Sequence, residues 1–334
     1  MKNILEYEEY RKLLDNPLWH LCRSNTENAI SNFWAYLIQT AGNTSIILGE
    51  KYNKNIDGKD ILREKFHIDI LLNLEDEIII IENKAKSLPN NKQLEEYAKK
   101  LKEKKEYKSK EIKKYLITPI QTKNADPDIQ YLTYDDICKN INNYVSKANF
   151  NNETKIIINK FIEIMTSISK IIIESNKQYQ LLGYWKDKTS ESIIQQMCDD
   201  KIYPLLKYTN TIFIEDNICK EIKNITNIPE VDFSNARPLI SFKFKSNKGR
   251  LEGIQIQNKQ FKYFIEGPNS SISNEEIKQF AIEHKPYDYN FAGKKEICQY
   301  KTKDGIFKYR YVKIESKADL IKLLNFFVEK RKMI

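Results

Sequence analysis

Two carboxylic acids and a lysine near residue 80 have the types and the spacing that metal-assisted phosphoryl chemistry requires. They lie in residues 66–84, where two apolar, β-branched runs are separated by the acidic pair Glu75-Asp76. This pattern predicts a β-hairpin. A two-residue turn at the acidic pair places Asp69 directly opposite Glu82. Because side chains alternate along a strand, Lys84 then shares the face of Glu82.

The predicted register also assigns the other side chains of the hairpin. His67 is expected opposite Lys84, either facing the site or hydrogen-bonded as a packed histidine. Five apolar residues are expected on the opposite face, where they can form core: Ile68, Ile70, Leu72, Ile79 and Ile81. A slip of one residue would scatter the polar set.

The chemistry follows from the distance between the two acids. Directly opposed residues have Cβ atoms about 5 Å apart, and two carboxylates at that separation repel by roughly 3 kcal/mol at an effective dielectric near 20. A cation, a shared proton or the ammonium of Lys84 must offset this repulsion. A divalent metal held by two carboxylates can activate water and neutralise charge on a phosphoryl group. Oxygen ligands favour Mg²⁺ or Mn²⁺ over zinc, and the lysine can orient the water or stabilise the anionic transition state.

The elements that must position these residues can be read from the apolar periodicity. Helices are expected at 3–14, 25–40, 91–106 and 135–147, and strands at 45–51, 115–119 and 131–133. Asn25 or Thr26 is expected to cap the second of these helices, and Gly42-Asn43 to end it. Helices that alternate with strands predict an α/β fold with a central mixed sheet.

Residues 15 to 140 resemble the PD-(D/E)XK nuclease superfamily. Asp69, followed after twelve residues by Glu82-Asn83-Lys84, is similar to its D…E-x-K core, and Gln93 with Tyr97 is similar to the Q-x-x-x-Y helix of its RecB-type branch. An earlier stretch resembles the N-terminal helix of a bacterial group that often reads I-E-N-K at this site: Leu18-Trp19-His20-Leu21, Glu27, Ser31-Asn32-Phe33 and Ala35-Tyr36-Leu37. Ile68 stands where many members have proline, at a position that varies in the superfamily.

The resemblance implies a restriction-endonuclease-like fold, a mixed central sheet flanked by helices, and a Mg²⁺-dependent nuclease that acts on DNA, with Mn²⁺ as a substitute. Asp69 and Glu82 are expected to hold the metal, with the main-chain carbonyl of Asn83 as a third ligand. Lys84 is expected to position water or stabilise the phosphate. Defence against foreign DNA is one role that such an enzyme would serve.

The resemblance also bears on Gln93, Tyr97, Glu27 and Glu50. Gln93 and Tyr97 are i, i+4 neighbours, so they form either a surface pair or a helix face that supports the site or grips the scissile strand. Glu27, in the first turn of its helix, either interacts with the helix N-terminus or is a further ligand. Glu50 ends the predicted strand 45–51, and it either points at the site or lies in solvent. Arg63 is a candidate contact for phosphate or a partner of Glu50.

Composition favours a polyanionic partner but has a second explanation. The 334 residues carry a net charge of +9, and residues 84–114 hold twelve lysines against five glutamates. A basic stripe beside a metal site suits nucleic acid, DNA above all. The chain is rich in Lys, Asn and Ile throughout, however, so the stripe is equally well explained as a solvated helix surface.

Cysteine usage and hydropathy bear on location and partners. The five cysteines form no C-x-x-C pair, which favours free thiols in a reducing compartment. The acidic start does not resemble a signal peptide, and no apolar run reaches the length of a membrane span. We therefore expect a cytoplasmic protein without a membrane partner, and homo-oligomerisation stays open.

Three domains or segments are predicted: a nuclease domain at 1–150, a long connecting helix at 151–180, and an α+β domain at 181–334. The last should contain helices at 190–207, 273–283 and 317–332, strands at 239–244, 251–257, 261–266 and 306–314, and a turn at Asn258-Lys259. Aromatic residues alternate there with basic ones: Tyr263, Phe264, Tyr309 and Tyr311 with Lys262, Lys308 and Arg310. The alternation indicates either a nucleic-acid platform or an ordinary half-buried sheet.

Two other functions compete with the nuclease hypothesis. One is a module that binds nucleic acid or a protein partner on a nuclease fold without cleavage; the cost of a charged cluster without a metal argues against it. The other is a structural protein whose function lies in the C-terminal half. Metal titration separates the nuclease from both.

Overall fold

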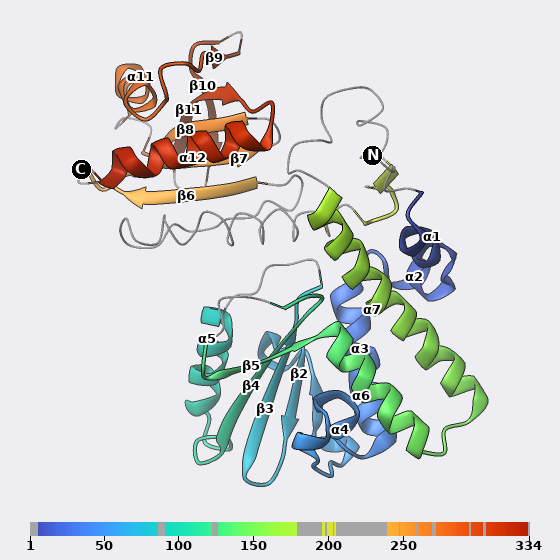
Figure 1. Cartoon of the computed structure of the whole chain (residues 1–334). Coiled ribbons are helices and arrows are strands. Elements are labelled where there is room, and N and C mark those ends of the chain that lie inside the picture. The colour runs from blue at the N-terminus through green and yellow to red at the C-terminus, as the bar shows by residue number, and fades with distance from the viewer. Residues whose placement is uncertain are drawn as a thin grey trace. The chain divides into compact units, whose positions relative to one another are not determined.

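The computed structural model describes residues 6–85, 91–121, 126–178, 196–197, 199–202, 204, 239–246, 248–257, 260–268, 272–293, 295–302 and 305–332 (Figure 1). The chain divides into two compact units. Unit 1 comprises residues 1–175 and 196–209, and unit 2 comprises residues 176–195 and 210–334. The helix predicted at 190–207 lies largely outside the described residues, and the turn predicted at Asn258-Lys259 lies wholly outside them.

A five-stranded mixed sheet forms the centre of unit 1. Its strands lie in the order β1 (Ile61–Arg63), β2 (Ile70–Asn73), β3 (Glu77–Asn83), β4 (Glu111–Thr118) and β5 (Ile129–Thr133). The first three pair antiparallel, whereas β4 and β5 extend the sheet in parallel. Ile70 lies opposite Ile81 and Asn73 opposite Ile78. The predicted hairpin register and the predicted mixed α/β sheet are confirmed.

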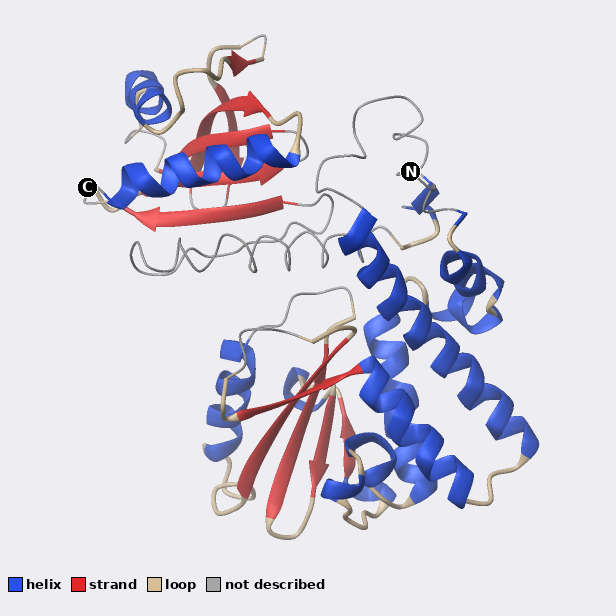
Figure 2. Ribbon diagram, in the orientation of Figure 1, coloured by secondary structure: helices blue, strands red, loops and turns tan. Residues whose placement is uncertain are grey.

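Helices flank this sheet on both sides. They are α1 (Glu8–Asp15), α2 (Pro17–Cys22), α3 (Thr26–Ala41), α4 (Ser45–Leu48), α5 (Asn91–Lys102), α6 (Tyr134–Lys147) and α7 (Asn152–Gln178). Helix α5 lies on one side, and α3, α6 and α7 lie on the other (Figure 2). Leu94 and Leu101 of α5 join a core cluster with Ile78 and Ile80 of β3. Both faces of the sheet are therefore buried.

Local cues explain the ends of two of these helices. Gly42 ends α3 with a left-handed φ of 61°, a conformation that costs glycine little. Thr133 begins α6 with a capping box, in which its side chain accepts from the amide of Asp136 and that carboxylate accepts from the amide of Thr133. Both lie where the sequence predicted a helix boundary.

The strand predicted at 45–51 is wrong. Ser45–Leu48 forms the short helix α4, and Glu50–Tyr52 follows as a 3-10 helix. Asn43 accepts a hydrogen bond from the amide of Ser45 at 2.8 Å, and the side chain of Asn140 donates to the carbonyl of Ile47 at 2.7 Å. A short run of buried apolar residues has no periodicity that separates a helix from a strand. Asn43, whose side chain can accept from an amide two residues later, was the available local signal for a turn.

The first half of the predicted hairpin strand is also wrong. Residues Lys65–His67 form a 3-10 turn, so β2 begins only at Ile70. His67 is therefore not paired with Lys84, whose amide donates to the carbonyl of Ile117 in β4 instead. Ile68 packs in the cluster that contains Ile80 rather than on the opposite face.

Helix α7 belongs to unit 1 up to Ser175. Phe161 stacks on Phe33 of α3 with ring centroids 3.9 Å apart, and Ser169 donates to the carbonyl of Pro119 at 2.7 Å. Beyond this helix, Asp200 accepts a hydrogen bond from Tyr10 of α1 at 2.6 Å. The compact unit thus extends past residue 150, and the helix predicted to connect the two halves packs on the first.

Unit 2 contains a separate antiparallel sheet. Its strands are β6 (Leu239–Lys245), β7 (Leu251–Gln257), β8 (Gln260–Gly267), β9 (Phe291–Ala292), β10 (Cys298–Thr302) and β11 (Gly305–Lys313). The order is β10-β11-β8-β7-β6, with β9 paired to β11. Helices α11 (Asn274–Glu283) and α12 (Lys317–Lys332) contribute to a core with Phe242, Ile254 and Phe261. The four predicted strands and these two helices are confirmed; β9 and β10 were not predicted.

The alternating aromatic and basic residues on the strands of unit 2 pack against other residues of the same unit. Lys262 is buried, with its ammonium 4.5 Å from the ring centroid of Tyr309, and Arg310 stacks 3.7 Å from the ring centroid of Phe291. Tyr263 and Phe264 are also buried. These side chains contact one another as in an ordinary sheet.

Two further predictions can be compared with the structure. Among the described cysteines, Cys138 and Cys298 are free thiols. Across the described parts of the chain, every helix is too short or too polar to cross a bilayer.

Candidate active site

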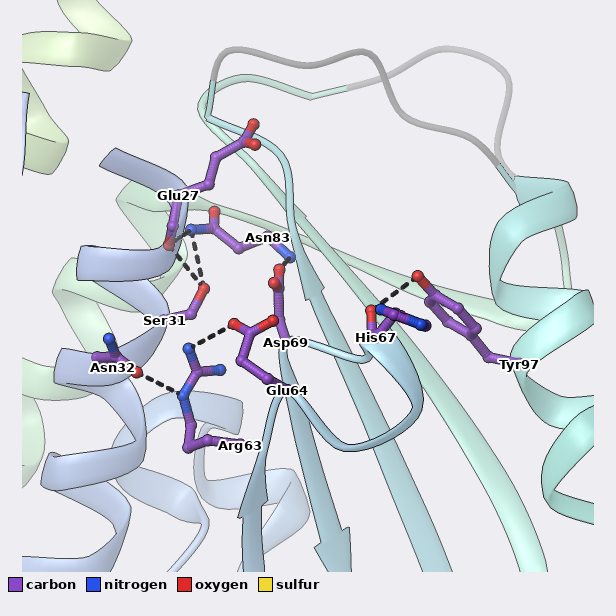
Figure 3. Close-up of polar contacts among 9 residues, drawn as sticks. All are labelled: Glu27, Ser31, Asn32, Arg63, Glu64, His67, Asp69, Asn83 and Tyr97. Atoms are coloured by element: carbon purple, nitrogen blue, oxygen red, sulfur yellow. Dashed lines mark hydrogen bonds and ion pairs between the residues drawn. The ribbon is translucent and has the colours of Figure 1, made fainter. Parts of the chain in front are cut away.

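The three residues predicted to do chemistry meet at the carboxyl end of β3. Asp69 precedes β2, and its Oδ2 accepts a hydrogen bond from the amide of Asn83 at 2.7 Å (Figure 3). Glu82 is the neighbouring residue of β3, and its Oε1 pairs with Nζ of Lys84 at 2.7 Å. Asp69 is only 9% exposed and Glu82 3%. The hairpin register that the acidic turn predicted therefore brings the two acids together.

Burial dominates the electrostatics of the two acids. Burial and the carboxylate of Glu82 raise the pKa of Asp69 to about 7. Burial also raises the pKa of Glu82, although the ammonium of Lys84 acts in the opposite direction. Two carboxylates in a site of low polarity resist double ionisation. Without a cation, Asp69 therefore holds a proton up to near-neutral pH.

Lys84 is more enclosed than a lysine beside an open site would be. Its side chain is 12% exposed. Burial acts to lower its pKa, but the carboxylates of Glu82, Glu27 and Asp69 outweigh burial and raise the pKa above its ordinary value. Lys84 thus stays charged, and it is a fixed cation at the edge of the acid pair.

Among the described residues, one oxygen of the acid pair has no hydrogen-bond partner of ordinary geometry. This atom is the buried Oε2 of Glu82, although the amide of Asp69 is near enough to the Glu82 carboxylate to lower its pKa. A buried, unpaired carboxylate oxygen is costly, and a divalent cation would relieve that cost. No group of three or more His, Cys, Asp or Glu side chains is arranged to hold a metal within the described ranges. A cation would therefore draw on these two acids and on main-chain or water oxygens.

Glu27 lies near the pair. It occupies the first turn of α3, and its charge contributes to the raised pKa values of Asp69 and Glu82. Figure 3 shows its side chain at the same end of the sheet as Asn83 and Asp69. The structure brings this candidate ligand to the site, and its role as a ligand stays a prediction.

The side chain of Asn83 is engaged in hydrogen bonds within the protein and is not available to a metal. Its Nδ2 donates to the carbonyl of Glu27 at 3.0 Å and to Oγ of Ser31 at 3.2 Å, and its Oδ1 accepts from Oη of Tyr134 at 2.8 Å. The side chain thus joins β3 to α3 and α6. Only the main-chain carbonyl of Asn83 is left for the predicted role in metal binding.

Gln93 and Tyr97 share one face of α5, as predicted. The amide of Gln93 donates to Oη of Tyr97, which donates to the carbonyl of His67 at 2.8 Å. Burial raises the pKa of Tyr97, and the charges of Glu82 and Asp69 add to the increase. The pair lies beside the acids and is bonded to the turn that precedes Asp69. His67 itself is exposed.

Glu50 does not belong to this site. It lies in the 3-10 helix after α4, where its carboxylate pairs with Lys147 at 2.9 Å. Two residues later, Tyr52 donates to Glu77 at the start of β3. The site lies at the other end of β3, and five residues of strand span about 16 Å. The prediction of Glu50 as a ligand is wrong because it depended on a strand that does not form.

Arg63 contacts Asn32 and Glu64 rather than Glu50. Its Nε donates to Oδ1 of Asn32 at 2.8 Å, and its Nη2 contacts Glu64 at 3.2 Å, so it does not pair with Glu50. Ser31 and Asn32 stand out in the sequence only as part of the resembling helix. Tyr134, which holds Asn83, was missed because no local motif connects it to a strand 51 residues away.

Part of the basic stripe has structural partners. Lys102 and Lys110 donate to main-chain carbonyls, Lys113 pairs with Glu77 at 2.6 Å, and Lys114 pairs with Glu95. Lys99 and Lys100 of α5 are exposed. The number of lysines available to a polyanion is therefore smaller than composition suggests.

Comparison of the chain with known protein families, with curated proteins and with solved structures finds no match in any of the three. Any function assigned to this site thus depends on the residues and geometry of the chain itself.

Proposed function

We propose that unit 1 is a Mg²⁺-dependent nuclease of the PD-(D/E)XK type that hydrolyses phosphodiester bonds in DNA. The observation that carries the proposal is the buried pair of Asp69 and Glu82, with one Glu82 oxygen unpartnered and Lys84 beside it. Buried acids whose pKa values are raised occur preferentially at functional sites, and burial raises the pKa of both acids here. Glu77 and Glu266, which belong to structural ion pairs, also leave one oxygen without a hydrogen bond among the described residues, so the site is distinguished by an unpartnered oxygen beside a second buried acid.

The arrangement of elements supports the same proposal. Helix α3, the antiparallel strands β1 to β3, helix α5 and the parallel strand β4 follow one another in the chain. This is a central mixed sheet with helices on both sides, as the resemblance implies. The acids lie at a strand end next to a helix N-terminus, where Glu27 of α3 approaches them.

The residues present fit a hard divalent cation. Asp69 and Glu82 would hold it, with the main-chain carbonyl of Asn83 as a further oxygen donor, and oxygen donors favour Mg²⁺ or Mn²⁺. The carboxylate of Glu27 would join them only after its side chain turns toward the pair. When bound, such a cation activates water and neutralises charge on the phosphoryl group.

The side chains of the site have separate tasks in this proposal. Lys84 presents a permanent positive charge to the phosphate or orients the attacking water, because the surrounding acids keep it protonated. Gln93 and Tyr97 act from α5, where their hydrogen bonds fix the turn before Asp69. The apolar cluster of Ile68, Ile80 and Leu94 limits access of bulk water to the pair.

A second candidate is a module that binds nucleic acid or a protein partner without cleavage. It is favoured by the ion pair between Lys84 and Glu82, which neutralises one acid without any metal. It leaves the second oxygen of Glu82 unexplained.

The test is a cleavage assay with the full chain. Linear, circular, single-stranded and modified DNA are incubated with Mg²⁺, with Mn²⁺ or with EDTA, and metal binding is measured in parallel by calorimetry. We expect metal-dependent cleavage that Glu82→Gln abolishes. Metal binding without cleavage of any substrate favours the binding module, and absence of both metal binding and cleavage contradicts the nuclease.

A further inference from the structure

The turn at residues 64–67 has an unusual backbone. Glu64, Phe66 and His67 have φ values of 52°, 60° and 66°. Left-handed conformations are strained for residues with a Cβ; histidine tolerates them moderately, but a bulky residue such as phenylalanine is a clear outlier. Glycine would adopt each conformation at lower cost. The turn ends two residues before Asp69.

Contacts from the segment after α5 hold one side of this turn. Lys65 donates to Oη of the buried Tyr107 at 2.8 Å, and the ring of Phe66 meets the ring of Tyr107 edge-on, with centroids 6.4 Å apart. The ammonium of Lys104 lies 5.8 Å from the centroid of Phe66. Tyr107 is therefore the residue that both central positions of the turn contact.

The two helices beside the sheet hold the ends of the turn. At its start, Arg63 is fixed by Asn32 of α3. At its end, the carbonyl of His67 accepts from Tyr97 of α5 (Figure 3). Ile68, the next residue, is fully buried in the cluster beneath α5. A strained segment persists only when its surroundings over-determine it, and here contacts from both sides of the sheet do so.

We propose that the 64–67 turn is a strained element that positions Asp69, and that Tyr107 is a positioning residue of the site. The turn directs the Asp69 carboxylate onto the amide of Asn83, where it lies beside Glu82. Residues other than glycine reduce the conformations open to the turn, so the acid has one position before any metal binds. The consequence for catalysis rests on the proposed nuclease function; the position of Asp69 does not.

The first experiment compares Glu64→Gly with Glu64→Ala in the full chain. Both lose the contact to Arg63, and only glycine relieves the strain. We expect Glu64→Gly to melt about 2–4 °C higher than Glu64→Ala, yet to bind Mn²⁺ roughly 10–100-fold more weakly, as expected when a partner that orients a ligand is lost. The amide of Asn83 should exchange hydrogen faster in the glycine variant, because its acceptor on Asp69 moves.

A higher melting temperature together with a lower Mn²⁺ affinity would show that the turn positions Asp69 rather than only stabilising the fold. Equal losses of melting temperature and Mn²⁺ affinity would show that the turn serves stability alone and would overturn the proposal. Unchanged Mn²⁺ affinity together with unchanged exchange at Asn83 would also overturn it.

The second experiment tests Tyr107 directly. Tyr107→Phe removes the hydroxyl that binds Lys65 and keeps the ring against Phe66, whereas Tyr107→Leu removes both. Tyr144→Phe is the matched control, since its hydroxyl donates to the carbonyl of Ala41, away from the turn. We expect exchange at the Asn83 amide to increase from the control to Tyr107→Phe and again to Tyr107→Leu. An equal increase in Tyr144→Phe and Tyr107→Phe would contradict the positioning role.

The readouts also separate this proposal from the nuclease function. If the wild-type chain binds no Mn²⁺, the nuclease proposal fails, while exchange at Asn83 still tests the turn. If wild type binds Mn²⁺ and the variants bind it equally well with equal protection of Asn83, the turn proposal fails and the nuclease proposal stands.

Discussion

At the scale of single residues, the site is governed by how deeply its charges are buried. Asp69 and Glu82 are both buried, and the ammonium of Lys84 balances part of their charge. Burial is the largest cause of the raised pKa of both acids. The unfolding free energy of the metal-free protein should therefore depend on the protonation of these acids, and urea unfolding at several pH values measures it.

Asp69→Asn should stabilise the metal-free protein increasingly as pH rises. Because folding raises the pKa of Asp69 from 3.8 to about 7, the folded wild type binds more protons than the unfolded chain between these values. Its stability consequently falls as pH rises through this window and stays lower above it, by about 1.4 kcal/mol for each pH unit that separates the folded from the unfolded pKa. Asparagine does not titrate and still accepts from the amide of Asn83.

Urea unfolding in EDTA at pH 5, 6, 7 and 8 measures this effect. The gain from Asp69→Asn should be smallest at pH 5 and largest at pH 8, and Mg²⁺ affinity should fall. A loss of stability of the same size at every pH would identify Asp69 as a structural residue.

Lys84→Ala should slow cleavage strongly and also lower the stability of the fold. Loss of the cation beside the phosphate should reduce the cleavage rate by roughly 10²–10³-fold, as for other single electrostatic contacts. The variant also removes the charged hydrogen bond to the buried Glu82, which should cost about 1–3 kcal/mol at pH 8. The loss should shrink at low pH, where Glu82 becomes neutral.

The control for this variant is Lys139→Ala, an exposed lysine of α6. It should change the unfolding free energy by less than about 0.5 kcal/mol and leave cleavage intact. Single-turnover rates and urea unfolding give both quantities. Wild-type cleavage by Lys84→Ala would remove this lysine from the proposed mechanism.

At the scale of elements, the site depends on a junction between a strand and two helices. Asn83 ends β3 inside the protein and bonds to Glu27 and Ser31 of α3 and to Tyr134 of α6. The same residue holds Asp69 through its amide. Asn83 thus makes both the hydrogen bonds that join β3 to two helices and the hydrogen bond that orients Asp69.

Asn83→Ala should destabilise the metal-free protein by roughly 2–4 kcal/mol, since it leaves several buried polar partners unsatisfied. Tyr134→Phe removes one of these hydrogen bonds, so its cost should be about 1 kcal/mol. Urea unfolding without metal compares the two variants. If both variants lose the same unfolding free energy, the hydrogen bonds from Asn83 to α3 contribute nothing to stability. That result would contradict the role of Asn83 as a junction between β3 and α3.

At the scale of the whole molecule, we predict that unit 1 contains the chemistry and unit 2 affects selection or assembly of the substrate complex. The acids of the site all belong to unit 1, whereas two basic residues of unit 2 are buried. These are Lys262 and Arg250, and Arg250 pairs with Glu276. Three lysines on its strands are exposed: Lys245, Lys301 and Lys313.

Alanine at these three exposed lysines should weaken DNA binding and reduce its salt dependence. The slope of log affinity against log salt should fall by up to about 3, one for each lost phosphate contact. The Mg²⁺ dependence and the single-turnover rate at saturating DNA should not change. Loss of Mg²⁺ binding in this variant would mean that unit 2 completes the site.

This design is preferable to a truncation after α7. Asp200 bonds to Tyr10 of α1 and to Gln196, and residues 196–209, which follow α7 in the chain, belong to unit 1. A shortened chain would lose these contacts, and its activity could not be attributed to unit 2.

Much of the site could be predicted because its signals are local. An acidic turn between two alternating apolar runs determines the register of β2 and β3, and the register alone brings Asp69 to Glu82. Gln93 and Tyr97 share a helix face because they are four residues apart. Gly42 ends α3 because it adopts a left-handed φ without strain. Each property depends on neighbours in the chain.

Only the tertiary structure decided the features that depend on distant residues. Residues 45–48 are helical because Asn140 and the surrounding core cover all of their faces, which leaves no periodicity to read. The 64–67 turn is left-handed because Tyr97 and Tyr107 hold it there, against the preference of its own residues. Glu50 lies far from the acids because its segment does not enter the sheet. Helix preference is worth a fraction of a kcal/mol per residue and a left-handed conformation costs about 1–2 kcal/mol per residue, so packing against distant residues overrides both.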